Sequence, residues 1–264
     1  MLGGLFVRCR GKEVSEDSWR RKAARTLLEL LVIAPHHEVT RELASEALWP
    51  QSDLYTARNN IYAVMTSLRR AIGQRGEGPQ FVVLDGGVIR ADPDLVRCDV
   101  DEFRRLARSV LAGSGDDLHC MGECCELEGC FPGNIVMPSS DPTGLFSRCH
   151  HEIATLYADA MVAGSEAALR LGRATIAVRL ARNAATTDPL REDVEEGVVR
   201  ALIAAGRTRE ARLHYESYAR KVIATLGVPP SARLRSLVND ACGREGDARS
   251  GKLEGMVYGG ALPA

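Results

Sequence analysis

The chain has 264 residues, of which 45% are hydrophobic and 5% aromatic, and its formal net charge is −1. This apolar content is enough to bury a core, and the shortage of aromatic residues favours packed helices over a β-sandwich or barrel. No apolar run approaches the ~20 residues that a membrane span needs, and the first residues lack the apolar stretch of a signal peptide. We therefore expect a cytoplasmic protein with no membrane partner.

The charges are distributed unevenly along the chain. Residues 1–75 contain 12 Lys and Arg against 8 Asp and Glu, whereas residues 98–150 contain 4 against 9. A basic N-terminal region attracts phosphate, which is a modest indication of nucleic-acid binding. The eight cysteines stand in a chain without an export signal, so we expect reduced thiols and not a disulfide framework.

The N-terminal region predicts a hairpin and then a helix. Residues 5–14 form two short β-rich runs around the dipeptide GK, which predicts a small hairpin. Residues 20–34 place their leucines at helical spacing, and a proline closes that helix. His36 and His37 follow in a predicted loop, where we expect both rings to face solvent.

Two more helices and a second hairpin follow. Thr40 is a predicted N-cap for a helix that stops at Pro50. A third helix is predicted over residues 56–72, with its apolar residues on one face, and Gly73 ends it. Residues 81–91 contain two β-rich runs around the turn sequence DGG, which predicts a hairpin. Three helices followed by a hairpin is the order of a winged helix-turn-helix.

The rest of the chain is predicted to be mainly helical. Residues 99–112 predict one helix, whereas residues 113–145, rich in Gly, Pro and Cys, predict irregular structure. From His151 the pattern is helical almost to Ala241. The tripeptides LGR and AGR, which begin at Leu171 and Ala205, stand 34 positions apart. This is the helix-turn-helix period of tetratricopeptide repeats.

These elements predict a mainly α-helical fold in two parts. We expect a winged helix-turn-helix DNA-binding domain with small β-hairpins over residues 1–97, and an all-α, tetratricopeptide-like helical repeat domain over residues 98–242. Residues 243–264 contain six glycines and few apolar residues, which predicts a disordered tail.

Three segments resemble a known family of regulators. The first is KAARTLLELLVIAPHHEVTRELASEALWP followed by ARNNIYAVMTSLRRAIG, and it resembles the N-terminal, response-regulator-type DNA-binding domain of the Streptomyces antibiotic regulatory protein (SARP) family. The second comprises CDVDEFRRL and LEGCFPG, which resemble the junction into the family's bacterial transcriptional activator domain. The third is ATTDPLREDVEEGVVRALIAAGRTREARLHYESYARKVIATLGVPPSARLRSL, which resembles the repeat core of that domain. The cysteine-rich stretch 120–130 departs from the family's apolar choices.

The exposed face of the third helix is the main candidate for contact with double-stranded DNA. Arginine can read guanine, and asparagine can read adenine, by paired hydrogen bonds at the major-groove edge. Residues at the far end of the helix are better placed for phosphates. We predict base contacts from Arg58, Asn59, Tyr62 and Thr66 and phosphate contacts from Arg69 and Arg70. The alternative is an ordinary solvated helix face.

Supporting contacts with the DNA backbone are predicted from three places. These are the start of the first helix, the N-terminus of the second, where free backbone N–H groups favour phosphate, and the wing hairpin. The predicted residues are Arg21, Lys22 and Arg25, then Thr40 and Arg41, and finally Arg90. Arg21 and Arg25 could equally form a solvent-facing pair.

The resemblance also implies protein partners. In related winged helices, the turn between the second and third helices contacts RNA polymerase, which makes Gln51, Ser52 and Asp53 a candidate activation surface. A plain connecting turn is an equal alternative. The resemblance further implies a homodimer on DNA that occupies directly repeated half-sites.

The cysteine cluster offers a rival interpretation. His119, Cys120, Cys124, Cys125 and Cys130 lie close together, but their spacing, C-x3-C-C-x4-C, lacks the two close pairs of a typical zinc site. Buried cysteine is commonly a small hydrophobic residue. We therefore predict no metal and no cofactor, and a Cys-dependent metal or redox sensor remains an alternative.

Together these features predict a sequence-specific DNA-binding transcriptional activator, not an enzyme. The sequence has no phosphate-binding loop, no H-E-x-x-H and no G-x-S-x-G motif. A second alternative is a protein-interaction scaffold that uses only the helical repeats.

Overall fold

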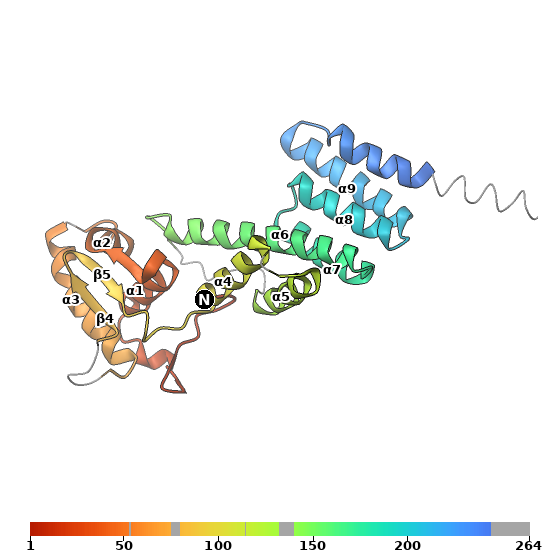
Figure 1. Ribbon diagram of the computed structural model, residues 1–264. Helices are drawn as coiled ribbons and strands as arrows, with labels where there is room; N and C mark the ends of the chain where they lie inside the picture. Colours follow the sequence, from red (N-terminus) through yellow and green to blue (C-terminus); the bar gives the residue numbers. More distant parts are fainter. Residues whose placement is uncertain (53, 75–79, 114, 132–139, 244–264) are drawn as a thin grey trace, which may run out of the picture. The chain divides into compact units, whose positions relative to one another are not determined.

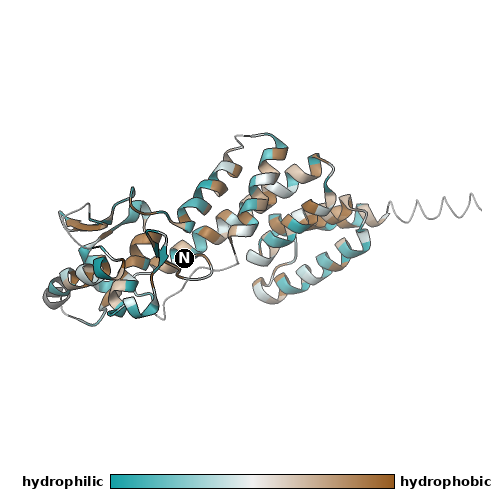
Figure 2. Ribbon diagram, turned by 90° about the horizontal axis from the view of Figure 1, so that it is seen from below, coloured by the Kyte–Doolittle hydropathy of each residue, from teal (hydrophilic) through white to brown (hydrophobic). Residues whose placement is uncertain are grey.

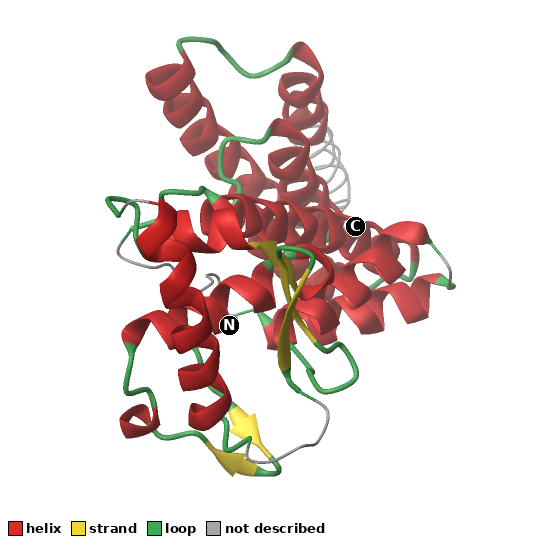
Figure 3. Ribbon diagram, turned by 90° about the vertical axis from the view of Figure 1, so that its left-hand side faces the viewer, coloured by secondary structure: helices red, strands yellow, loops and turns green. Residues whose placement is uncertain are grey.

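The computed structural model describes residues 1–52, 54–74, 80–113, 115–131 and 140–243 (Figure 1). The chain forms two compact units. The first comprises residues 1–106 with residues 126–154, and the second comprises residues 107–125 with the chain from Thr155 onward. The predicted boundary between residues 97 and 98 therefore lies inside the first unit. Strands occur only in the N-terminal part of the described chain, and the rest of its regular structure is helical (Figure 3).

A short hairpin opens the first unit. Strands β1 (Arg8–Cys9) and β2 (Lys12–Glu13) pair antiparallel. The turn residues Arg10 and Gly11 both have positive φ, 51° and 77°, as a two-residue hairpin turn requires. The hairpin is confirmed, with its turn one residue earlier than predicted.

The three helices of the winged helix are confirmed. They are α1 (Lys22–Ile33), α2 (Arg41–Leu48) and α3 (Leu54–Ala71), with a 3-10 turn η1 (Glu16–Ser18) before them. Figure 2 shows hydrophilic and hydrophobic residues on different faces of the helices. The core takes leucine from α1 and the apolar stripe of α3, as their spacing predicts. Its fully buried members include Leu27, Leu30, Leu31, Ile61, Val64 and Leu68.

The wing belongs to a three-stranded sheet. Strands β4 (Val82–Asp85) and β5 (Val88–Ala91) form the predicted hairpin, and Gly86 and Gly87 supply the positive φ of its turn. A third strand, β3 (Glu38–Thr40), pairs antiparallel with β5, so that the strand order is β3-β5-β4. The sequence did not predict β3, because three residues paired with a distant strand leave no local pattern.

The expectation that both adjacent histidines face solvent is wrong for His37. The 3-10 turn η2 (Pro35–His37) leaves His36 exposed but buries His37, of which 8% is exposed. The His37 ring contacts the carbonyl oxygen of Leu31 at 3.1 Å and the carboxylate of Asp101 at 2.9 Å. These two acceptors compensate the burial of a polar ring.

Three further helices follow the wing: α4 (Asp99–Ala112), α5 (Asp117–Cys130) and α6 (Leu145–Arg170). The prediction of irregular structure over residues 113–145 is wrong for α5. Its buried residues Cys124 and Leu127 are three positions apart, so a cysteine occupies an apolar position of a helix. The sequence counted cysteine and glycine as signs of a loop, which hid this helix.

The repeat core comprises α7 (Ala174–Thr187), α8 (Glu192–Ala204), α9 (Thr208–Leu226) and a last helix over residues 232–243. Gly172 and Gly206 end the helices before α7 and α9 with φ of 68° and 69°. After each glycine, an arginine N–H donates to the carbonyl oxygen five residues earlier, at 2.7 Å from Arg173 and 2.9 Å from Arg207. Because the same helix ending recurs at 34 positions, the predicted repeat is confirmed.

Among the described residues, no helix is both long enough and apolar enough to cross a membrane.

Candidate nucleic-acid interface

Helix α3 presents a polar face opposite its buried stripe. Asn59, Tyr62, Thr66 and Arg70 are exposed and are separated by intervals of three and four residues, which place them on one side of a helix. Tyr62 is 59% exposed. The Thr66 hydroxyl donates to the Tyr62 carbonyl oxygen at 2.8 Å, which leaves the lone pairs of the hydroxyl available. The side chain of Arg58 lies outside the described part of the chain.

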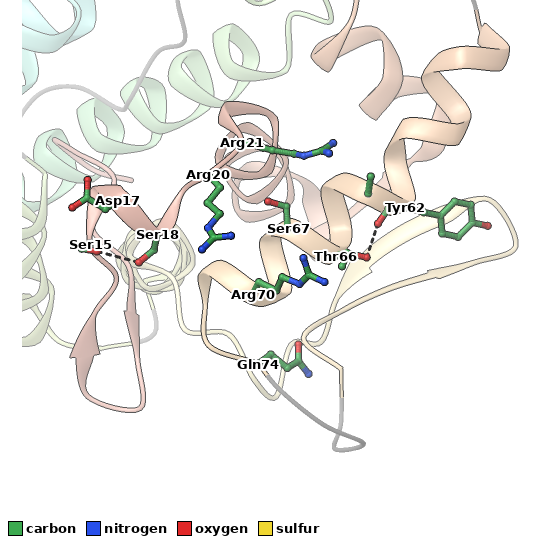
Figure 4. Close-up of a pocket in the computed structure, with 11 residues that line it drawn as sticks. Ser15, Asp17, Ser18, Arg20, Arg21, Tyr62, Thr66, Ser67, Arg70 and Gln74 are labelled. Carbon is green, nitrogen blue, oxygen red and sulfur yellow. Dashed lines mark hydrogen bonds between the residues drawn. The ribbon is translucent and has the colours of Figure 1, made fainter.

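An open groove of about 1230 Å³ runs beside this face (Figure 4). One wall comes from the segment that leads into α1, and the other comes from the C-terminal part of α3. The lining residues are Ser15, Asp17, Ser18, Arg20 and Arg21 on the first wall and Tyr62, Ala63, Thr66, Ser67, Arg70 and Gln74 on the second. The sequence predictions missed Ser18 and Ser67, because a groove between distant segments has no local signature.

The groove is positively charged. Arg20, Arg21 and Arg70 are exposed, and none of them makes an ion pair within the described residues. Asp17 is the one acidic residue among the described residues that line the groove. Figure 4 shows the side chains of Arg20 and Arg70 facing the space between the two walls. We call Arg20, Arg21 and Arg70 the groove arginines. Three cations against one anion suit a phosphate-rich ligand.

Arg25, predicted as a phosphate contact, is engaged inside the protein. Its Nη1 donates to both carboxylate oxygens of Glu16, at 2.7 and 2.8 Å, and its Nε donates to Glu29 at 3.2 Å. Burial opposes the charge, but the hydrogen bonds to these two carboxylates raise the pKa of Arg25. Burial raises the pKa of Glu29. Because Glu16 lies in η1, Arg25 ties to α1 the segment that carries Arg20 and Arg21.

Two more predicted cations hold the wing. Arg69 donates from Nε and Nη2 to the carbonyl oxygen of Val82, at 3.2 and 2.6 Å, and burial lowers the pKa of Arg69. This contact fastens the end of α3 to β4. Arg90 lies 2.9 Å from Glu38, so that an ion pair joins β5 to β3. These guanidinium groups position the wing beside α3.

The start of α2 is built as predicted for a capped helix. The Thr40 hydroxyl accepts the Leu43 N–H at 3.2 Å. The Arg41 N–H donates to the Gly87 carbonyl oxygen at 2.8 Å, and the Arg41 guanidinium lies 3.9 Å from Glu42. Lys22 is exposed at the first turn of α1. The turn of the wing is therefore held against the N-terminus of α2.

The family comparison concerns the C-terminal part of the chain. Residues 139–240 match the model of the bacterial transcriptional activator domain. A comparison with curated protein sequences finds no match.

A solved structure is similar in fold to most of this chain. It is Mycobacterium tuberculosis EmbR in complex with a low affinity phosphopeptide, which is 22% identical, with a TM-score of 0.67 over 89% of this chain and 62% of that chain. At this identity the likeness establishes the fold. The matched domain model and the EmbR-like fold agree with the resemblance to SARP regulators seen in the sequence.

The cysteines of residues 120–130 precede the matched activator domain. Cys124 is fully buried, and its thiol donates to the Ala160 carbonyl oxygen at 3.1 Å. Burial raises the pKa of Cys120 and of Cys124, which keeps both thiols protonated, whereas metal binding and oxidation require thiolates. Within the described residues, no three His, Cys, Asp or Glu side chains gather as a metal site. Cys124 contributes to helix packing.

The turn between α2 and α3 is exposed at Gln51 and Ser52. The Ser52 N–H donates to the Trp49 carbonyl oxygen at 3.1 Å, which closes the turn. Asp53, the third residue of the predicted polymerase contact, lies outside the described residues.

Proposed function

We propose that this protein activates transcription by binding a specific DNA sequence, with α3 in the major groove. The observation that carries the proposal is the exposed polar face of α3 beside the groove arginines. In this assignment, residues 1–97 bind DNA and residues 98–242 form the activator domain, with residues 243–264 as a disordered tail. The protein performs no chemistry and requires no cofactor.

The two sides of the interface have different tasks. Asn59, Tyr62 and Thr66 contact base edges, because they are exposed on the outward face of the helix. Arg58, predicted from the sequence, contributes a further base contact. Arg70, Arg20 and Arg21 bind phosphates along one strand, because the three charges line one groove. This division assigns sequence specificity to α3 and much of the salt-dependent affinity to the groove.

The remaining predicted cations support the interface. Lys22 is exposed beside Arg21 and adds a phosphate contact. The N-terminus of α2 approaches a phosphate with the side chains of Thr40 and Arg41, because the Arg41 and Leu43 N–H groups already have acceptors within the protein. Arg25, Arg69 and Arg90 support DNA binding indirectly. Their guanidinium groups contact acceptors within the protein and hold the first groove wall and the wing in place.

The partners of the DNA complex follow from the likeness to SARP regulators. Two copies occupy directly repeated half-sites as a homodimer. The turn that contains Gln51, Ser52 and Asp53 contacts RNA polymerase. The exposure of Gln51 and Ser52 at the start of α3 supports this contact, because a polymerase bound beside the operator reaches a surface next to the major groove.

Selection from a random DNA library tests the proposal. The full chain is incubated with random duplexes, and the bound fraction is amplified and sequenced over several rounds. We expect a short motif repeated in the same orientation, and a selected duplex that binds at least about 10³-fold more tightly than a random one at physiological salt. Failure to enrich any motif, with equal affinity for selected and random duplexes, would contradict the proposal.

A further inference from the structure

His37 lies where both nitrogens of its ring face hydrogen-bond acceptors. Nδ1 is 3.1 Å from the carbonyl oxygen of Leu31 in α1, and Nε2 is 2.9 Å from a carboxylate oxygen of Asp101 in α4. A neutral imidazole carries a single N–H and satisfies one acceptor, whereas the imidazolium ion donates to both. Because 8% of His37 is exposed, water does not readily replace a lost partner. The geometry therefore selects the protonated ring.

The charges around His37 balance only when its ring is protonated. Arg104 Nη1 lies 3.7 Å from Asp101, and Arg104 Nη2 lies 2.8 Å from Glu152 in α6. Arg104 also donates to the carbonyl oxygen of Ile33 at 3.3 Å. Burial raises the pKa of the neighbouring Cys149 thiol, which stays neutral. Two carboxylates and one guanidinium leave one negative charge, which the imidazolium ion neutralises.

The backbone at this point is strained. His36 and His37 have φ of 56° and 57°, in the left-handed region that ordinary residues rarely adopt. Such conformations are unfavourable and persist where surrounding contacts hold them. The Leu31 and Asp101 contacts of the His37 ring contribute to holding this turn, together with the hydrogen bond from the His37 N–H to the Ala34 carbonyl oxygen at 3.1 Å.

The strained turn leads directly into the DNA-binding elements. His37 is followed by β3, whose Glu38 pairs with Arg90 on the wing strand and whose last residue, Thr40, caps α2. On the other side, Glu152 lies within the matched activator domain. The contacts among His37, Asp101, Arg104 and Glu152 thus connect the winged helix with the part of the chain that matches the activator-domain model. All four residues lie inside the first compact unit.

We propose that His37 and Asp101 form a protonation-dependent latch, which fastens the start of α4 to the winged helix and opens when the imidazolium ion loses its proton. The hydrogen bond that the His37 ring donates to Asp101 raises the pKa of His37 above its ordinary value, against the effect of burial. A raised folded-state pKa stabilises the latch fully below the ordinary imidazole value. This stabilisation is lost as the pH rises through the raised value. The latch is closed in mild acid and opens towards alkaline pH.

Amide hydrogen exchange of the full chain tests the latch without DNA. Exchange is followed from about pH 6 to about pH 9, with each rate corrected for intrinsic base catalysis. In the wild type, protection of residues 35–40 and 99–106 falls by up to about tenfold per pH unit, the slope of one released proton. Protection of α8, in the second unit, is the internal reference and does not change with this slope.

Two histidine variants separate the latch from other titrations. In His37→Gln the same segments exchange faster and lose this pH dependence, whereas His36→Gln, which alters the exposed neighbour, behaves as the wild type. Other ionisable groups of the first unit are the Met1 amino group, 2.8 Å from Asp99, and His150 and His151 of α6. Their contribution persists in both variants, so an equal pH dependence in the wild type and in His37→Gln would overturn the latch.

A second measurement applies if His37→Gln fails to fold. The His37 ring is titrated by NMR in the wild type and in Asp101→Asn, among the six histidines of the chain. We expect the wild-type midpoint of His37 to lie above the ordinary imidazole value and to fall in Asp101→Asn. A wild-type His37 midpoint at or below the ordinary imidazole value would overturn the proposal.

Discussion

The winged helix and the repeat core contain similar numbers of cations but use them differently. Residues 1–75 hold 12 Lys and Arg, and residues 151–242 hold 13. Several arginines of residues 151–242 are paired with acids: Arg170 with Asp117 at 2.7 Å, Arg191 with Asp159 at 2.6 Å and Arg212 with Glu216 at 2.9 Å. The groove arginines have no such partner within the described residues. Whether arginines are paired with acids, more than the net charge of a region, distinguishes a surface that can bind phosphate from one that cannot.

The strongest test of this comparison removes the groove arginines together. Arg20→Ala/Arg21→Ala/Arg70→Ala is expected to weaken binding of a selected duplex by about 10²-fold to 10³-fold at low salt. The slope of log affinity against log salt should fall by about 3, because each phosphate contact contributes nearly one released counterion. Fluorescence anisotropy over a salt series measures both quantities.

The matched control removes the same number of charges from the repeat core. Arg200→Ala/Arg209→Ala/Arg212→Ala changes net charge equally but leaves the groove intact. We expect its affinity and salt slope to match those of the wild type. Equal losses in the two triple variants would mean that net charge, and not the groove, determines affinity.

A second test compares engaged and free arginines within the winged helix. Arg69→Ala removes both hydrogen bonds to the Val82 carbonyl oxygen and leaves that oxygen without them. We expect it to destabilise the wing by about 1–2 kcal/mol, a discounted value because the guanidinium is only half-buried. Hydrogen exchange of β4 and β5 measures the loss of protection.

The salt dependence of DNA binding shows whether Arg69 also contacts phosphate. If its guanidinium serves only the wing, Arg69→Ala lowers affinity without changing the salt slope. Arg69→Lys keeps the charge but loses the paired donors, so it should resemble Arg69→Ala in wing protection. A salt slope that falls by about 1 in Arg69→Ala and is restored in Arg69→Lys would show that Arg69 contacts phosphate, as the groove arginines do.

The sequence predicted those parts of the fold that depend on local pattern. Apolar spacing located α1, α3 and α4, and the DGG turn located the wing. Strand β3 escaped prediction because its partner, β5, lies about fifty positions away in the sequence. Helix α5 escaped because Cys124 contributes to the core as a small apolar residue, which composition alone counts as a loop signal.

The candidate site divides in the same way. The outward face of α3 follows from helical periodicity, which is why Asn59, Tyr62 and Thr66 were identified from the sequence. The tasks of Arg69 and Arg90 depend on acceptors in other elements, Val82 and Glu38, and no spacing rule reveals them. Tertiary pairing, which decides which arginines are free, is visible only in the folded chain.

The smallest expected effect belongs to an exposed pair of the repeat core. Arg212 donates to Glu216 one helical turn away at 2.9 Å, and both side chains are largely exposed. Such a pair gains little, because water screens the attraction and ordering two long side chains costs entropy. Arg212→Ala should therefore leave DNA affinity, salt slope and the thermal unfolding midpoint unchanged. A lower affinity in this single variant, with an unchanged unfolding midpoint, would show that the repeat core also contributes charge to DNA binding and would break the contrast between the two regions.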